Sequence, residues 1–117
     1  MMPKIKIINQ PITLSEVKKI AQATFGEMAK AVVDLEKKIL AIGGQMHADS
    51  EALLINKGSQ QKNLWGFNIY PDEPRGCRLE FSSLINIRPA VNNRSMTIKN
   101  AVIKKKIRKI VSDLIQK

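Results

Sequence analysis

Two extended stretches, each ending at a proline, constrain the fold of this chain most strongly. Residues 63–70 end at Pro71 and residues 78–88 end at Pro89, and proline stops a strand because it has no backbone N–H to donate. The segment between them, Pro-Asp-Glu-Pro-Arg-Gly, has the composition of a turn. The pattern predicts two strands that form a hairpin with a loose connection.

The second of these stretches alternates between two kinds of side chain. One face would carry Leu79, Phe81, Ser83, Ile85 and Ile87, and the other would carry Arg78, Glu80, Ser82, Leu84, Asn86 and Arg88. Because successive side chains of a strand point to opposite faces, the pattern predicts one buried face and one wet face. Phe81, with Trp65 or Phe67, is predicted to lie between the sheet and the helices, since aromatic residues are large enough to anchor that layer.

A short strand and a helix are predicted near the start of the chain. Residues 4–8 alternate like a strand, which would lie at an edge of the sheet. Thr13 followed by Glu16 fits a capping box, and an apolar stripe at helical spacing comes next. A helix is therefore predicted from Leu14 to Phe25.

Residues 30–47 allow two interpretations. Leu35, Ile39 and Ile42 would suit one face of a helix. However, β-branched residues are frequent here, Gly43 and Gly44 would weaken a helix end, and Glu36-Lys37-Lys38 could turn. We therefore predict a second hairpin.

Two further helices complete the predicted fold. Asp49 is predicted to cap a helix over residues 50–57 that ends at Gly58, and Thr97 or Asn100 is predicted to cap the last helix. The resulting order, β-α-β-β-α-β-β-α, predicts an α+β fold in which a mainly antiparallel sheet carries its helices on one face. Its first six elements match the split βαβ, or ferredoxin-like, arrangement.

Size and composition limit the class of protein. With 117 residues and 44% hydrophobic residues, the chain is predicted to form a single domain over residues 1–117. One cysteine and one histidine cannot build a tetrahedral metal site or an internal disulfide, so we expect no metal, no cofactor and a reducing compartment. No apolar run is long enough for a signal peptide or a membrane span, which predicts a soluble, cytoplasmic protein without a membrane partner.

The formal net charge of +10 favours polyanionic partners, and half of it lies in one segment near the end of the chain. The cations of this segment are Lys104, Lys105, Lys106, Arg108 and Lys109. On a helix they could line phosphate groups of a nucleic acid. They would equally form an ordinary solvated helix face, and no aromatic residues are interleaved with them for base stacking.

A second group of candidate residues is His47, Asp49 and Glu51. If the chain were extended there, the three side chains would share one side and could perform acid–base chemistry. Helix capping by Asp49 and a favourable helix dipole at Glu51 explain two of the three without any catalytic role. The sequence therefore leaves an enzymatic activity open.

The third group follows the second proline. Arg88 and Arg94 enclose a polar loop that includes Asn93 and Ser95. Two guanidinium groups with short polar side chains could hold a phosphate or a carboxylate, whereas a loop that merely caps the last helix would also use Asn and Ser. The arginines favour an anion site.

Several motifs together resemble a known family. They are Gly43-Gly-Gln-Met-His-Ala-Asp49, Gly58-Ser59, Leu64-Trp-Gly-Phe-Asn-Ile-Tyr-Pro71, Ser83-Leu-Ile-Asn-Ile-Arg-Pro89 and Asn93-Arg-Ser95. Their combination is similar to a small bacterial domain-of-unknown-function family of uncharacterised proteins. This resemblance implies a bacterial single-domain protein and supplies no catalytic residues. From the residues themselves, a binding module for an anionic ligand is the first hypothesis, nucleic-acid binding the second and an enzyme the third, with the oligomeric state left open.

Overall fold

The central element of the structure is an antiparallel sheet with the strand order β1-β4-β3-β5-β6. The computed structural model describes residues 5–116, and the sheet comprises β1 (Lys6–Ile8), β3 (Ala29–Asp34), β4 (Ile39–Ile42), β5 (Leu64–Ile69) and β6 (Leu79–Glu80). Neighbouring strands of this sheet pair antiparallel in every case. The predicted α+β class with a mainly antiparallel sheet is confirmed. The predicted first strand is also found at a sheet edge, although Lys4 lies outside the described residues.

Residues 30–47 contain the predicted hairpin rather than a helix. Val33 pairs with Leu40, and the Asp34 carboxylate turns the chain by accepting hydrogen bonds from the backbone N–H groups of Glu36 and Lys37, both at 2.9 Å. Lys38 completes the turn in the left-handed region, with φ 57°. Because the last four residues of β3 are buried, its sequence lacks the clear alternation of a half-exposed strand.

Three helices accompany the sheet among the described residues: α1 (Leu14–Thr24), α2 (His47–Asn56) and α3 (Ala101–Leu114). The capping box of Thr13 and Glu16 at the start of α1 is confirmed. Asn100 caps α3, because its side-chain oxygen accepts from the backbone N–H groups of Val102 and Ile103 at 2.8 and 3.0 Å. Both signals are local in sequence, which is why they could be read from it.

The start of α2 differs from the prediction. The N-cap residue is Met46, which provides no side-chain cap, and Asp49 already lies within the first turn. The helix therefore begins at His47 instead of at residue 50. An acidic residue in the first turn still complements the positive end of the helix dipole.

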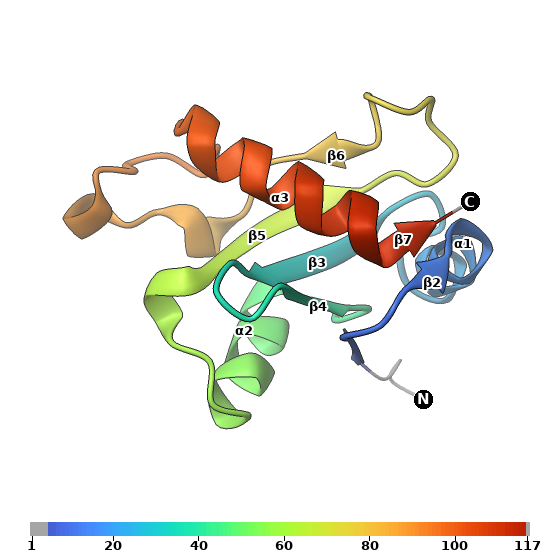
Figure 1. Ribbon diagram of the computed structural model, residues 1–117, viewed down its shortest axis with the longest axis horizontal. Helices are drawn as coiled ribbons and strands as arrows, with labels where there is room; N and C mark the ends of the chain where they lie inside the picture. Colours follow the sequence, from blue (N-terminus) through green and yellow to red (C-terminus); the bar gives the residue numbers. More distant parts are fainter. Residues whose placement is uncertain (1–4, 117) are drawn as a thin grey trace.

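The helices occupy both faces of the sheet, which corrects the predicted one-face arrangement (Figure 1). Val17 of α1 and Ile107 of α3 belong to the main core, whereas Leu54 of α2 packs on the other face with Val32 and Leu64. The connectivity explains this difference. β1 and β3 are parallel with β4 between them, and β4 and β5 are parallel with β3 between them, so α1 and α2 belong to two split βαβ units.

Both crossovers step in the same direction across the sheet, but β1 and β4 run antiparallel. Crossovers of the same hand then place their helices on opposite faces. The split βαβ connectivity suggested by the element order is present, and the ferredoxin-like resemblance extends no further than this connectivity.

The long strand predicted for residues 78–88 is wrong beyond Glu80. Only Leu79 and Glu80 pair with β5, and the chain continues through two short 3₁₀ turns, Leu84–Asn86 and Pro89–Val91. The side chain of Asn86 replaces the missing strand partner of Gly66: its carbonyl oxygen accepts from the Gly66 N–H, and its amide donates to the Gly66 carbonyl, both at 2.8 Å. A Cβ atom on Gly66 would lie 2.7 Å from the Ser83 side chain, so this close approach requires glycine.

A second, two-stranded sheet joins the two ends of the described chain. Its strands, β2 (Ile12–Thr13) and β7 (Ile115–Gln116), pair in parallel. They hold the start of α1 beside the end of α3 (Figure 1). No helix in residues 5–116 has the length and apolar character needed to cross a membrane.

The aromatic layer lies where it was predicted. Trp65 and Phe67 are buried in the main core, and the partly buried Phe81 packs against the same cluster. The same cluster includes Ile107 and Ile110 of α3. The prediction that the aromatic residues anchor the sheet–helix layer is confirmed.

Candidate functional site

A cavity lies beside the second half of α3. It has a volume of about 510 Å³ and is bounded by α3, the start of α1, β7 and the connection from β5 to β6. In Figure 1 that connection and β7 lie on the same side of the molecule. A volume of this size is within the range of small-molecule sites. We call it the α3 pocket.

The body of the α3 pocket is aliphatic. Its apolar lining consists of Leu14, Ile69, Leu79, Val111 and Ile115, one residue from each of α1, β5, β6, α3 and β7. Ser112 and Gln116 are the uncharged polar side chains of the lining. The pairing of β2 with β7 brings Leu14 and Ile115 together at this place. The pocket therefore forms only when β2 and β7, from the two ends of the described chain, pair with each other.

Three arginines, Arg75, Arg78 and Arg108, line the same pocket. Arg78 donates from Nε to the Glu73 carbonyl oxygen at 2.9 Å, which leaves its two terminal nitrogens as donors. The guanidinium carbon of Arg108 lies 4.9 Å from the centre of the Phe81 ring, so the aromatic face orients this group. Arg75 is exposed in the connection.

The charge of the α3 pocket is strongly positive. Among the described residues that line it, none is acidic. The carboxyl end of a helix carries roughly half a negative charge, which is small beside three guanidinium groups. The pocket can therefore accept an anion that has an apolar portion.

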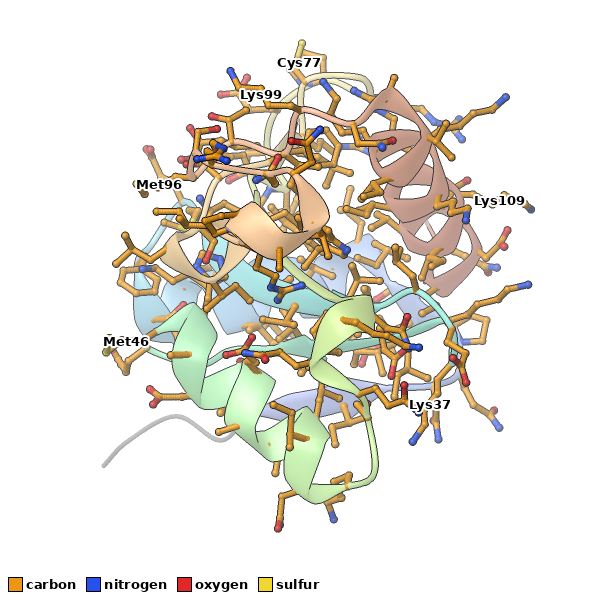
Figure 2. The ribbon with its side chains drawn as sticks, turned by 90° about the vertical axis from the view of Figure 1, so that its left-hand side faces the viewer. Lys37, Met46, Cys77, Met96, Lys99 and Lys109 are labelled. Atoms are coloured by element: carbon orange, nitrogen blue, oxygen red, sulfur yellow. The ribbon has the colours of Figure 1, made fainter. Side chains whose placement is uncertain are left out.

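The cations predicted for nucleic-acid binding lie along α3. Lys105, Lys106 and Lys109 are exposed, and Lys104 is half-buried. Figure 2 shows Lys109 projecting outward from α3, where it pairs with Asp113 at 2.9 Å. Arg108 belongs to the α3 pocket. Nucleic-acid binding by this segment stays a prediction.

Arg88, the first residue of the predicted anion site, makes interactions within the protein. Its Nη2 lies 3.3 Å from Glu51 Oε2, and its guanidinium carbon lies 4.9 Å from the centre of the Trp65 ring. Burial lowers the pKa of the Arg88 guanidinium, while the negative charge of Glu51 opposes this effect. The Nε and Nη1 atoms are buried without a hydrogen-bond partner among the described residues.

The other residues of the predicted anion site organise the loop around them. The Asn93 amide donates to the carbonyl oxygens of Asn86 at 2.8 Å, Ser95 at 2.9 Å and Thr97 at 3.2 Å, and its own oxygen accepts from the Lys99 N–H. The Ser95 hydroxyl donates to the Thr97 carbonyl oxygen. Arg94 is exposed. Anion binding by Arg88, Asn93, Arg94 and Ser95 stays a prediction, and the loop is ordered by its own hydrogen bonds.

The predicted acid–base group lies on a helix instead of an extended segment. His47 is buried at the start of α2, and its Nε2 lies 2.9 Å from the Phe67 carbonyl oxygen. Burial lowers the pKa of His47, and the hydrogen bond to the Phe67 carbonyl oxygen opposes this shift. Because a carbonyl oxygen can only accept, Nε2 is the donor in this hydrogen bond. Glu51 is one helical turn away and pairs with Arg88, while Asp49 is exposed. An acid–base role stays a prediction.

The sequence did not indicate that the three arginines of the α3 pocket would line one cavity. Arg75 was part of a turn-like segment, Arg78 was the first residue of the predicted second strand, and Arg108 was part of a basic run. The only available signal was the concentration of arginines near Pro74 and Gly76, which turn composition explained equally well.

The fold and the pocket define a small α+β protein with a basic cavity at one end of a mainly antiparallel sheet. The chain belongs to the family described as "Protein of unknown function (DUF5674)", whose model matches residues 6–114. No curated protein and no solved structure matches the chain. The resemblance to a family of uncharacterised proteins is confirmed.

Proposed function

We propose that this protein is a binding module for a small anionic ligand and that the α3 pocket is its binding site. One observation carries the proposal: three arginines line an aliphatic cavity of about 510 Å³ that has no acidic lining residue among the described ones. Bringing three like charges together is unfavourable without a counter-charge. An anionic ligand would supply that counter-charge.

The chemistry of the arginines supports this proposal. A guanidinium group stays charged and presents its donors in a planar fork that fits carboxylate and phosphate oxygens. Arg78 is held by the Glu73 carbonyl oxygen and Arg108 by the Phe81 ring. Less side-chain freedom is then lost when a ligand binds.

We expect Arg78→Gln and Arg108→Gln each to weaken anion binding by roughly 10- to 100-fold, because a hydrogen bond to a charged group is worth about 1.5–3 kcal/mol. Isothermal titration calorimetry with inorganic phosphate, octanoate and an alkyl phosphate measures this change. Lys57→Gln is the control, since it removes one positive charge from an exposed position outside the pocket. Equal weakening by Lys57→Gln would show that only the overall charge attracts the anions.

A second function, nucleic-acid binding by the outer side of α3, is favoured by Lys105 and Lys106. Both are exposed, and neither forms an ion pair with another described residue. We expect Lys105→Gln with Lys106→Gln to reduce the salt dependence of nucleic-acid affinity by about one unit of slope per lost phosphate contact. Fluorescence anisotropy across a range of salt concentrations measures this slope.

Lys57→Gln with Lys62→Gln is the control for this second function, because it lowers the net charge equally at exposed positions beside α2. The control should leave the slope closer to that of the parent protein. If both double variants give the same slope, α3 is not a specific nucleic-acid surface.

A further inference from the structure

We infer that the α3 pocket takes an aliphatic phosphate monoester, that is, a saturated or isoprenoid-like chain that carries a phosphate group. This inference rests on the proposed anion-binding function and adds the identity of both ends of the ligand. The two ends are recognised by different parts of the lining. The aliphatic side chains would contact the chain, and the arginines would contact the phosphate.

The composition of the lining argues for an aliphatic body. The five apolar lining residues are Leu, Ile and Val, and no aromatic side chain lines the pocket within the described chain. Proteins that hold a nucleobase usually provide an aromatic ring for stacking and polar groups for the base edge. Here Ser112 and Gln116 are the only uncharged polar side chains of the described lining. A flexible hydrocarbon chain fits this surface better than a flat polar ring.

The number of arginines in the lining argues for a phosphate rather than a monocarboxylate. A carboxylate has two oxygens and one charge, so a single guanidinium fork satisfies it. A phosphate monoester has three terminal oxygens and up to two negative charges near neutral pH. Arg78 retains its terminal nitrogens, and Arg108 lies on the Phe81 ring. With Arg75, three guanidinium groups are available for three phosphate oxygens.

The test is a calorimetric titration of the full chain with butyl, hexyl and octyl phosphate, each kept below its micelle concentration. Each buried methylene should increase affinity about fourfold, so hexyl phosphate should bind roughly 16-fold more tightly than butyl phosphate until the cavity is full. Octyl phosphate should also bind at least about tenfold more tightly than octanoate, because the phosphate offers one more charge and one more oxygen. Inorganic phosphate and AMP should bind more weakly than hexyl phosphate.

Two variants separate the ends of the ligand. Val111→Ala should reduce the gain per methylene while leaving the affinity for inorganic phosphate within about twofold, because Val111 belongs to the aliphatic lining. Arg78→Gln should reduce the affinity for all phosphates and preserve the gain per methylene.

A third variant tests whether the ligand occupies the cavity. Ser112→Trp, at an exposed position of α3, should fill the cavity and abolish alkyl phosphate binding without disturbing the fold, as checked by circular dichroism.

The possible failures are distinguishable. Affinity that does not rise with chain length, or AMP that binds as tightly as hexyl phosphate, overturns the aliphatic phosphate inference but leaves anion binding intact. If no anion binds the parent protein, the proposed function itself is wrong. Binding to vesicles that contain phosphatidic acid, without binding of monomeric alkyl phosphates, would assign the recognition to a membrane surface and overturn the inference.

Discussion

Asn86→Ala should lower the free energy of unfolding by about 3 kcal/mol or more. The Asn86 side chain is fully buried and pairs with both backbone polar groups of Gly66, and its amide also donates to the Met96 carbonyl oxygen at 3.1 Å. A buried polar group that loses its partner costs about 1–3 kcal/mol, and this variant leaves several such groups unpaired beside a new cavity. Urea denaturation followed by circular dichroism measures the change.

Asn56→Ala is the matched control, because Asn56 is exposed at the end of α2. It should change stability by less than about 0.5 kcal/mol. Asn86→Asp should remain severely destabilised, because it keeps an acceptor for the Gly66 N–H but loses the amide donors and buries a charge. A loss below about 1 kcal/mol for Asn86→Ala would mean that water or another group replaces the amide.

Glu51→Ala should destabilise the protein by about 3 kcal/mol, because it leaves the charge of Arg88 without its partner in a largely buried position. The Arg88 and Glu51 side chains are only 12% and 15% exposed. Arg88→Met should also be destabilising, since it leaves Glu51 uncompensated and removes the contact with Trp65. Urea denaturation of the single and double variants gives the coupling energy.

The double variant Arg88→Met with Glu51→Leu distinguishes a buried ion pair from a surface one. Replacing both charges by apolar groups should cost less than removing either charge alone. The exposed pair of Lys109 and Asp113 is the control, and its coupling should be about 0.3–0.5 kcal/mol. Additive losses for Arg88 and Glu51 would contradict the buried-pair interpretation. Anion titration of Arg88→Met, followed by thermal unfolding, would also test the anion-binding role predicted for Arg88.

Elements with short-range signals could be predicted from the sequence. Thr13 and Glu16 identified the start of α1, and Asn100 was one of the two predicted caps of α3, with Thr97 the other. Each observed cap bonds to backbone N–H groups two or three residues away, so its signal is local in sequence. The hairpin of β3 and β4 followed from β-branched residues and a turn segment.

Elements that depend on long-range partners could not be predicted in this way. Residues 81–88 have strand-like alternation, but an asparagine side chain pairs with Gly66, which lies 20 residues earlier. The sequence around an asparagine does not reveal whether its side-chain amide will bond to water, to a loop or to a strand. The relative order and direction of β1 and β4 also decided on which face of the sheet α2 packs.

The sequence by itself determined the strong positive charge, the three helices and the antiparallel hairpins of the described chain, because composition, caps and periodicity act over a few residues. The tertiary structure alone decided which cations line the same cavity. It separates Arg88, paired with Glu51 from 37 residues away, from Arg75, Arg78 and Arg108, which line the α3 pocket. The physical reason is that burial, charge pairing and cavity shape arise only when distant segments pack, and here they depend on the sheet order and the pairing of β2 with β7.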